Sequence, residues 1–307
     1  MRLTLRQLEI FSAIARTENV SKAAGQLAMS QSAASSALVE LEKAYDQPLF
    51  DRVGKTLHLN TTGRGLLPAV DALLAQAHEV ESYLTGGKLG PLAIGATLTI
   101  GNYLATLLVA DYMRDHPEAP VRLHVANTEE VVGQLLRFEC DLGLIEGEAH
   151  APDLLVEPWL EDELVVFCAP QHPLTQGNDA SNLTLAEQQW ILRERGSGTR
   201  EQFDRTVGGT LGQLNILLEL EHTEAIKRAV ESGLGISCLS RLSLREAFRR
   251  GSLVEIATPQ FDLRRRFNLV QHRQRHLSSA ARTFLALCRH AAEGTKSTRD
   301  LPLQFIP

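Results

Sequence analysis

The stretch from Ser21 to Tyr45, SKAAGQLAMSQSAASSALVELEKAY, limits what this chain can fold into more than any other part of it. Its spacing of small and apolar residues predicts two short helices joined by a tight turn near Ala28–Met29. Ser21 and Ser30 stand where each helix would begin, and a serine hydroxyl can cap the free N–H groups of a first turn. Such a pair is typical of a helix-turn-helix, which places its second helix in a DNA groove.

The second helix of the pair has two unlike halves. Its rear half carries Leu38, Leu41 and Tyr45 at helical spacing, which predicts an apolar face packed on a core. Its front half is small, polar and uncharged, and glutamine and serine side chains there can hydrogen-bond to base edges. The candidate DNA contacts are Ser21, Ser30, Gln31, Ser32, Ala33, Ser35 and Ser36. The alternative interpretation is a surface helix with a serine-rich cap.

The segments on either side extend this pair into a larger unit. Residues 3–15 predict a helix whose apolar face consists of Leu5, Leu8, Phe11, Ile14 and Ala15. Residues 48–63 predict a hairpin with a basic turn, in which Arg52 and Lys55 are candidate contacts to phosphates or the minor groove. Three helices followed by a basic wing predict a winged helix-turn-helix domain over residues 1–63.

At this point a family resemblance is evident. The segment LRQLEIFSAIARTENVSKAAGQLAMSQSAASSALVELEKAYDQPLFDRVGKTLHLNTTG resembles, without a gap, the N-terminal domain of LysR-type transcriptional regulators. The resemblance implies a DNA-binding dimer with a linker helix and a ligand-sensing domain. Two residues depart from the family pattern: Ser32 stands where a proline is usual, and Ser36 where a long basic or amide side chain is frequent. These departures affect the expected operator sequence and leave the expected fold unchanged.

A long helix is predicted next, capped by Thr61 or Thr62 and running to about Thr85. Its apolar residues follow heptad spacing: Leu66, Val70, Leu73, Ala77, Val80 and Leu84. We expect this stripe to pair with its copy in a second subunit, and the alternative is packing against its own domain. A glycine-rich segment ending at Pro91 breaks the helix, so residues 64–90 are predicted to form a dimerisation linker and hinge.

From Leu92 onward, strands alternate with helices, which predicts a parallel sheet with helices on its faces. A strand over 163–170 is expected to start a further sheet, and a strand over 267–272 is expected to return to the first. We therefore predict a two-lobed α/β effector domain that resembles periplasmic solute-binding proteins and crosses between its lobes twice. Its expected parts are lobe I (91–161 and 268–293), lobe II (162–267) and a tail (294–307), either disordered or packed as an extended segment.

Polar residues gather where the predicted strands feed helix starts, and such junctions suit anions because helix N-termini offer free N–H groups. The candidate effector contacts are Thr97, Thr99, Ile100, Asn127, Ser197, Gly198, Thr199, Arg200 and Thr223. For each junction the alternative is simple helix capping. The family resemblance implies an effector between the lobes, and we expect a sulfur oxyanion or a small carboxylated or phosphorylated metabolite. No cofactor or metal is expected.

Composition narrows the function classes. The net charge is −6, yet residues 1–64 hold eight basic against six acidic side chains, so basic charge favours the DNA-binding end. Cys140, Cys168, Cys238 and Cys288 lack metal or redox spacing and are expected to be buried thiols. The sequence contains neither a signal-peptide core nor an apolar run of membrane-spanning length, so we expect a cytoplasmic protein.

Three other interpretations explain less of the sequence. An enzyme would need a set of catalytic residues. The sequence contains no G-x-S-x-G nucleophile elbow, H-E-x-x-H motif, phosphate-binding Walker loop or dinucleotide-binding fingerprint. A secreted solute receptor would leave the first 85 residues unexplained, and an architectural DNA protein would leave the two lobes unexplained. We therefore predict an effector-responsive transcriptional regulator whose partner is promoter DNA. The resemblance implies a dimer that assembles into a tetramer, with RNA polymerase as a further candidate partner.

Overall fold

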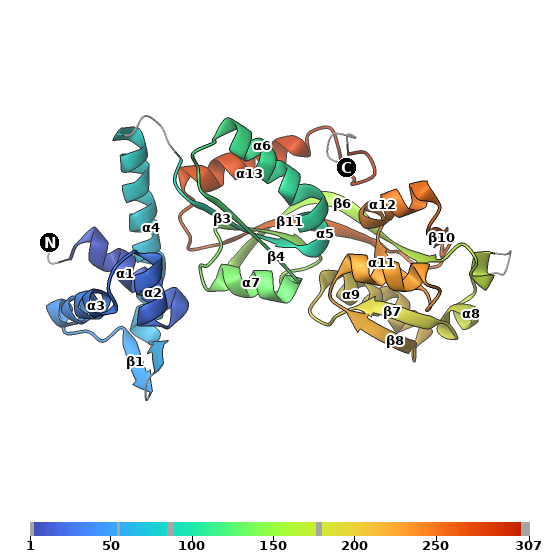
Figure 1. The fold of residues 1–307 in the computed structure, drawn as a ribbon, viewed down its shortest axis with the longest axis horizontal. Coiled ribbons are helices and arrows are strands. Elements are labelled where there is room, and N and C mark those ends of the chain that lie inside the picture. The colour runs from blue at the N-terminus through green and yellow to red at the C-terminus, as the bar shows by residue number, and fades with distance from the viewer. Residues whose placement is uncertain (1–2, 54–55, 85–88, 176–179, 302–307) are drawn as a thin grey trace.

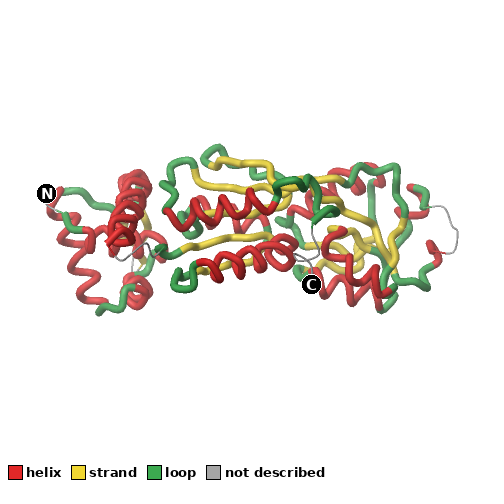
Figure 2. Tube along the Cα trace, turned by 90° about the horizontal axis from the view of Figure 1, so that it is seen from above, coloured by secondary structure: helices red, strands yellow, loops and turns green. Residues whose placement is uncertain are grey.

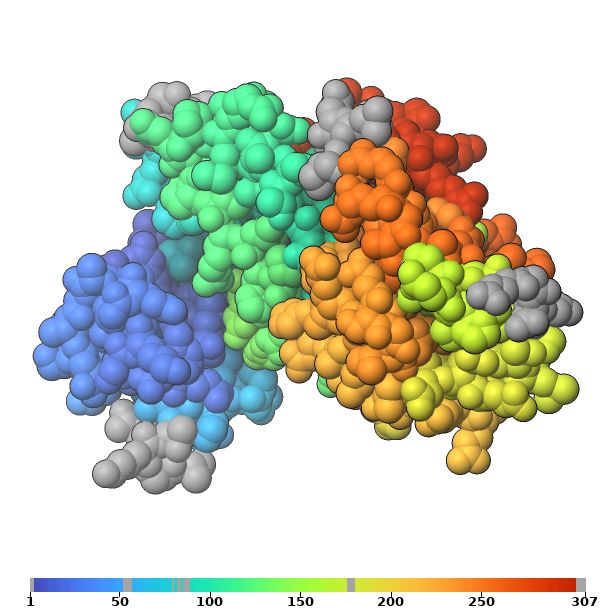
Figure 3. All heavy atoms as spheres, turned by 45° about the vertical axis from the view of Figure 1, so that its right-hand side comes forward, coloured from blue at the N-terminus to red at the C-terminus, as the bar shows by residue number. Residues whose placement is uncertain are grey.

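The computed structural model describes residues 3–53, 56–84, 89–175 and 180–301. An N-terminal head, a long helix and a two-lobed α/β part follow one another along the chain (Figure 1). Figure 3 shows the head at one end and the second lobe at the other, with the first lobe between them. The elements of the head and the helix that follows are α1 (Leu5–Thr17), α2 (Val20–Gln26), α3 (Gln31–Tyr45), β1 (Phe50–Val53), β2 (Thr56–Leu59) and α4 (Thr61–Leu84).

The two helix starts of the helix-turn-helix are capped by different residue types. Ser30 caps α3 as predicted, because its Oγ accepts a hydrogen bond from the Ala33 N–H at 3.2 Å. The predicted cap at Ser21 is wrong, since α2 begins at Val20 and the Asn19 side chain caps it. Asparagine is as good an N-cap as serine, so the cap lies two residues closer to the N-terminus.

The head packs around one apolar core. Its buried members include Leu8, Phe11, Ile14, Ala23, Ala24, Leu38 and Leu41. The predicted faces are wrong at two positions, since Leu5 is 47% exposed and Tyr45 is 46% exposed. Each is a terminal residue of its helix, so its side chain lies at the edge of the packed helices.

The predicted apolar stripe of helix α4 lies in two different environments. Val70 is buried in the head core, whereas Leu73, Val80 and Leu84 are 41%, 61% and 81% exposed. The cap of the helix lies one residue before the predicted ones, because the Asn60 Oδ1 accepts the Gly63 N–H at 2.8 Å. The first half of α4 therefore belongs to the head, and its second half leaves apolar side chains uncovered in the single chain.

The two-lobed part is built on a sheet with the strand order β10-β6-β11-β5-β3-β4, to which β9 is added beside β6. Strands β7 and β8 form a separate parallel pair. The strands are β3 (Leu92–Thr97), β4 (Val121–Ala126), β5 (Leu142–Glu146), β6 (Leu154–Cys168), β7 (Gln189–Arg193), β8 (Asn215–Leu220), β9 (Ser237–Ser240), β10 (Val254–Ile256) and β11 (Arg264–His272).

Helices cover both lobes. In lobe I, α6 and α13 cover one face of the sheet and α7 covers the other (Figure 1). The helices of lobe I are α5 (Leu98–Ile100), η1 (Gly101–Ala105), α6 (Thr106–Asp115), α7 (Thr128–Leu136) and α13 (Ser279–Ala291). Those of lobe II are η2 (Pro173–Thr175), α8 (Asn182–Ala186), α9 (Gly198–Phe203), η3 (Asp204–Gly208), α10 (Gly209–Leu211), α11 (Thr223–Glu231) and α12 (Arg241–Arg250).

Two long strands join the lobes. β6 and β11 pair in antiparallel fashion over their common length and run from one lobe into the other (Figure 2). The predicted strand start near residue 163 is wrong, since β6 begins at Leu154 and is 15 residues long. A register shift between Phe267 and Asn268 interrupts the ladder where the lobes meet.

The chain after α13 returns to the boundary between the lobes. Ser297 forms a parallel bridge with Glu161 on β6, and Leu301 is buried in the core of lobe I. The described part of the tail is therefore packed, as one of the two alternatives from the sequence had it, but it is not extended throughout, because it turns at residues 298–300. Residues 302–307 lie outside the described residues.

Candidate functional site

The candidate DNA contacts gather at the start of α3. Gln31, Ser32, Ala33 and Ser36 are exposed there, whereas Ser35 is half-buried. Ser21, on α2, is also exposed. The rear of α3 is anchored by its buried leucines, so a polar front is held on a fixed support, which suits a recognition helix.

Strands β1 and β2 form the predicted antiparallel wing beyond α3. Lys55 lies outside the described residues, and the same holds for the side chain of Arg52. Their expected phosphate contacts therefore stay predictions.

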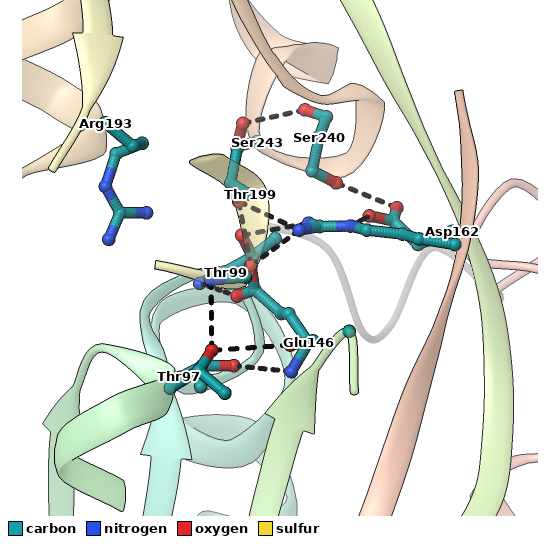
Figure 4. A network of polar contacts seen from close by, with 12 residues as sticks. Thr97, Thr99, Glu146, Asp162, Arg193, Thr199, Ser240 and Ser243 are labelled. Carbon is teal, nitrogen blue, oxygen red and sulfur yellow. Dashed lines mark hydrogen bonds and ion pairs between the residues drawn. The ribbon is translucent and has the colours of Figure 1, made fainter. Parts of the chain in front are cut away.

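A buried ionic cluster lies between the two lobes, and Arg265 is its centre. Its Nε donates to Asp162 Oδ2 at 2.7 Å, and its Nη1 donates to Glu146 Oε2 at 2.8 Å. The three side chains are 0–2% exposed. Arg265 and Asp162 are register partners on the crossing strands, whereas Glu146 ends strand β5 of lobe I. Figure 4 shows Glu146 and Asp162 on opposite sides of this network.

The Glu146 carboxylate is held by donors from both lobes. The Thr99 N–H, at the start of α5, donates to its Oε1 at 2.6 Å, and the Thr199 hydroxyl donates to its Oε2 at 3.0 Å. Burial alone would raise the pKa of Glu146, but the charges of Arg265 and Arg193, with these donors, lower it to about 2. The cluster therefore contains a carboxylate that is ionised at neutral pH and is surrounded by donors.

The pKa of Asp162 shifts in the opposite direction to that of Glu146. Burial raises the pKa of its carboxyl, and the charge of Arg265 and the Ser240 hydroxyl only partly offset that effect. Ser240 Oγ donates to Asp162 Oδ1 at 2.8 Å. Asp162 is thus the member of the cluster that depends most on its hydrogen-bond donors.

The lobes touch through a close backbone contact beside this cluster. The Gly198 N–H donates to Thr128 Oγ1 at 3.1 Å, and Thr128 Oγ1 donates to the Glu146 carbonyl at 3.3 Å. A Cβ on Gly198 would lie 2.2 Å from that carbonyl oxygen, so only glycine allows this approach. The two lobes are therefore in direct contact beside the cluster.

Four of the predicted effector residues meet at this cluster: Thr97, Thr99, Gly198 and Thr199. Thr97 Oγ1 accepts the Glu146 N–H at 3.1 Å. The Thr223 hydroxyl is buried at the start of α11 and has no hydrogen-bond partner within the described chain. A buried hydroxyl without a partner is costly, so Thr223 is still a candidate contact for the effector.

The other predicted residues are placed differently. Ile100 is fully buried in the core of lobe I, and Asn127 caps α7 through the Glu130 N–H at 3.0 Å. Arg200 is paired with Glu219 and Asp204, at 2.7 and 2.9 Å. The structure therefore gives each of these three a structural role and does not bring it to the cluster.

A groove of about 470 Å³ opens beside the cluster between the lobes. Its lobe I wall includes Thr128 and His150, and its lobe II wall includes Ser197, Arg200 and Glu201. Ser197 lines this groove although it is only 3% exposed.

Sequence reasoning missed Glu146, Asp162 and Arg265. Three consecutive arginines carry no local signal, since the alternation of exposed Arg264, buried Arg265 and exposed Arg266 appears only in the folded strand. Residues 103 and 119 positions apart supply the partners of Arg265, and the sequence alone does not show such pairing.

The cysteines all belong to the two-lobed part of the chain. All four cysteines are buried, as predicted, and burial raises the pKa of Cys140 and Cys168 to about 11. Within the described ranges, histidine, cysteine and acidic side chains do not gather into a group fit to hold a metal ion. None of the helices in those ranges has the length and apolar character that spanning a bilayer requires.

Comparison with known proteins identifies both parts of the chain. Residues 5–64 match the model of the bacterial regulatory helix-turn-helix protein, lysR family, and residues 85–293 match the LysR substrate binding domain. The uncharacterized HTH-type transcriptional regulator YeiE of Escherichia coli K12 is 46% identical, over 94% of this chain and 98% of that protein.

Solved structures share the fold. A full-length OxyR variant from Pseudomonas aeruginosa superposes with a TM-score of 0.71 at 22% identity, covering 94% of each chain. The regulatory domain of CcmR from Synechocystis, in complex with 2-PG, superposes with a TM-score of 0.61 at 28% identity. That match covers 67% of this chain and 99% of the CcmR domain.

Proposed function

We propose that this chain, which belongs to the LysR family of bacterial transcriptional regulators, responds to a small oxyanion bound between its two lobes. The observation that carries the proposal is the Glu146 carboxylate, which is held by the Thr99 N–H, the Thr199 hydroxyl and the Arg265 guanidinium. Those donors would suit an equally small free anion, because a helix start, a hydroxyl and a guanidinium all favour negative charge.

An arriving oxyanion would compete with Glu146 for these donors. Two carboxylates and one guanidinium already share the cluster, so the oxyanion would be a third negative group. It cannot enter beside Glu146 without strong repulsion. We infer that the effector displaces the Glu146 side chain while the lobes are parted. The effector therefore binds two arrangements of the protein with different affinity, which is the condition for a ligand to shift their balance.

The chemical class rests on the same donors. CcmR, whose regulatory domain is similar to lobes I and II, was solved with 2-PG, which supports a small effector here. A sulfur oxyanion and a small carboxylated or phosphorylated metabolite are the candidates. Ser197 and Thr223 are proposed as further contacts, because Ser197 lines the groove and the Thr223 hydroxyl is unpaired within the described chain.

Assembly and DNA binding complete the proposal. We propose that two copies pair through the exposed half of α4, where Leu73, Val80 and Leu84 need a partner surface. Pairing would present two α3 helices to two half-sites of a promoter. A tetramer of such dimers, and contact with RNA polymerase, are further parts of this proposed function.

The test is a titration of the full-length protein with sulfite, sulfate, phosphate, small carboxylates and 2-PG, followed by thermal unfolding and by promoter footprinting. We expect one oxyanion to raise Tm in a saturable way and to change the footprint. Glu146→Gln removes the competing charge, so that oxyanion should bind about tenfold more tightly, which corresponds to about 1.4 kcal/mol.

Glu246→Gln is the matched control, because it deletes one carboxylate of lobe II on the outer helix α12. It should leave oxyanion affinity unchanged. The proposal fails if only neutral or cationic compounds bind, or if both variants bind the oxyanion as the unchanged protein does.

A further inference from the structure

The C-terminal tail reaches the buried cluster from outside the two lobes. We propose that Thr298 is a positioning residue for the effector site: its hydroxyl fixes Asp162, and Asp162 in turn fixes Arg265. This inference rests on the proposed function for its link to an effector. Thr298 itself touches neither Arg265 nor Glu146 through any hydrogen bond among the described residues.

The contact is buried and specific. Thr298 is 4% exposed, and its Oγ1 donates to Asp162 Oδ1 at 3.0 Å. The same carboxylate oxygen accepts the Ser240 hydroxyl, and the other oxygen accepts Arg265 Nε. Asp162 is therefore held by one donor from each of three segments: lobe II, strand β11 and the tail. A buried carboxylate that loses a donor incurs a large desolvation penalty.

The backbone of the tail holds Thr298 in register. The Glu161 N–H donates to the Lys296 carbonyl at 2.8 Å, and the Thr298 N–H donates to the Glu161 carbonyl at 2.8 Å. These two bonds add the tail to β6 one residue before Asp162. They lie beside the register shift between the lobes, so the tail spans the point at which the lobes join (Figure 1).

A continuous chain of contacts leads from the tail to lobe I. Thr298 holds Asp162, Asp162 holds Arg265, and Arg265 holds Glu146. Glu146 accepts the N–H of Thr99 in the first turn of α5. An N–H in a first turn has no acceptor within its own helix, so the protection of the Thr99 amide reports the position of Glu146.

The effect of the Thr298 hydroxyl can be tested without disturbing the packing of the tail. Leu301 lies in the core of lobe I, so the tail keeps an apolar anchor when Thr298 changes. Thr298→Val preserves the shape of the side chain and removes the donor. Thr298→Ser keeps the hydroxyl donor and removes only the methyl group. Thr295→Val is the matched control, since Thr295 is in the same tail and is not among the described donors to Asp162.

The first measurement is amide hydrogen exchange in the full-length protein without any added anion. Thr298→Val should speed exchange at Thr99 about tenfold, whereas the central strands β3 and β5 should keep their protection. Thr298→Ser and Thr295→Val should exchange as the unchanged protein does. Unchanged exchange at Thr99 in Thr298→Val, or equal acceleration in Thr298→Ser, would overturn the positioning role.

The second measurement uses the oxyanion that gives the largest Tm rise among sulfite, sulfate and phosphate. Thr298→Val should weaken its binding at least fivefold, and Thr298→Ser should restore the affinity. Altered exchange without any anion binding keeps Thr298 as a positioning residue and refutes the proposed effector class. Anion binding that is the same in all variants refutes the role of Thr298 at the effector site.

Discussion

Glu146 is a charged side chain in a place that water does not reach. It stays ionised because Arg265, a threonine hydroxyl and a backbone N–H replace the lost hydration. The lowered pKa means that the folded state binds this proton far more weakly than the unfolded chain does. Glu146 therefore stabilises the fold only while it is ionised.

This gives a prediction for acid stability. The pKa of Glu146 falls from an ordinary 4.5 to about 2, so its contribution is complete above pH 4.5 and is lost as the pH falls toward 2. Glu146→Gln should be the less stable protein at pH 7, by up to about 3 kcal/mol. The stability difference between the two proteins, measured by urea unfolding, should shrink steadily below pH 4.5.

Glu246→Gln should follow the unchanged protein at every pH. A stability difference between Glu146→Gln and the unchanged protein that stays constant from pH 7 to pH 3 would show that Glu146 is not held as an ion.

Single residues of this site were only partly predictable. Thr97, Thr99, Gly198 and Thr199 were predicted because hydroxyls and glycine at strand-to-helix junctions have a local signature. Glu146, Asp162 and Arg265 were not, because charged residues at strand ends usually face solvent. Their burial is tolerable only after distant segments have brought them together, and a local pattern does not contain that information.

At the scale of elements, we expect α3 and the wing to divide the work that DNA binding requires. The front of α3 exposes polar side chains, whereas the sequence of the wing contains the basic residues Arg52 and Lys55. Base edges specify sequence, and phosphates mainly supply affinity that depends on salt. Changes in the two elements should therefore be distinguishable in one binding assay.

The prediction compares Gln31→Ala with Lys55→Ala on promoter fragments and on random duplex. Lys55→Ala should weaken binding to both and reduce the slope of log affinity against log salt by about one unit. Gln31→Ala should reduce the preference for the promoter and leave the salt slope unchanged. The assignment is reversed if Gln31→Ala flattens the slope and Lys55→Ala alters base preference.

Elements were predicted well where a period was long and regular, as in α1, α3 and α4. Only the second half of strand β6 was predicted. Its first half, LLVEPWLE, was missed because Pro158 and two glutamates lie among its apolar residues. That half lies between β11 and solvent, so its pattern is neither fully buried nor alternating. Helix α12 was missed because its sequence, RLSLREAFRR, is rich in arginine.

For the whole molecule, the proposed pairing through α4 would determine how many heads meet one promoter. Half of its apolar stripe packs on the head, and the other half is available to a second copy. Because a second head binds its half-site at a high effective concentration, pairing would multiply affinity although the contacts of each head stay the same.

Val80→Glu tests this arrangement, since Val80 is 61% exposed in the single chain. A charge in the seam should convert the dimer to monomers in sedimentation velocity, and binding to a two-half-site fragment should weaken about 100-fold. His78→Glu places a charge about 200° round the helix and should keep the dimer. A Val80→Glu protein that sediments as a dimer would place the subunit contact elsewhere.

The register shift between Phe267 and Asn268 determines how such a molecule can move. On either side of it, regular ladders between β6 and β11 resist bending, because every step would break paired amides. The interruption lacks such a regular step, so we expect it to be the point about which one lobe can tilt as a rigid block. A tilt of this kind needs no unfolding, and collective motions of rigid blocks take roughly microseconds to milliseconds. Under the proposed function, the effector would then change the angle between the lobes while the strands stay intact.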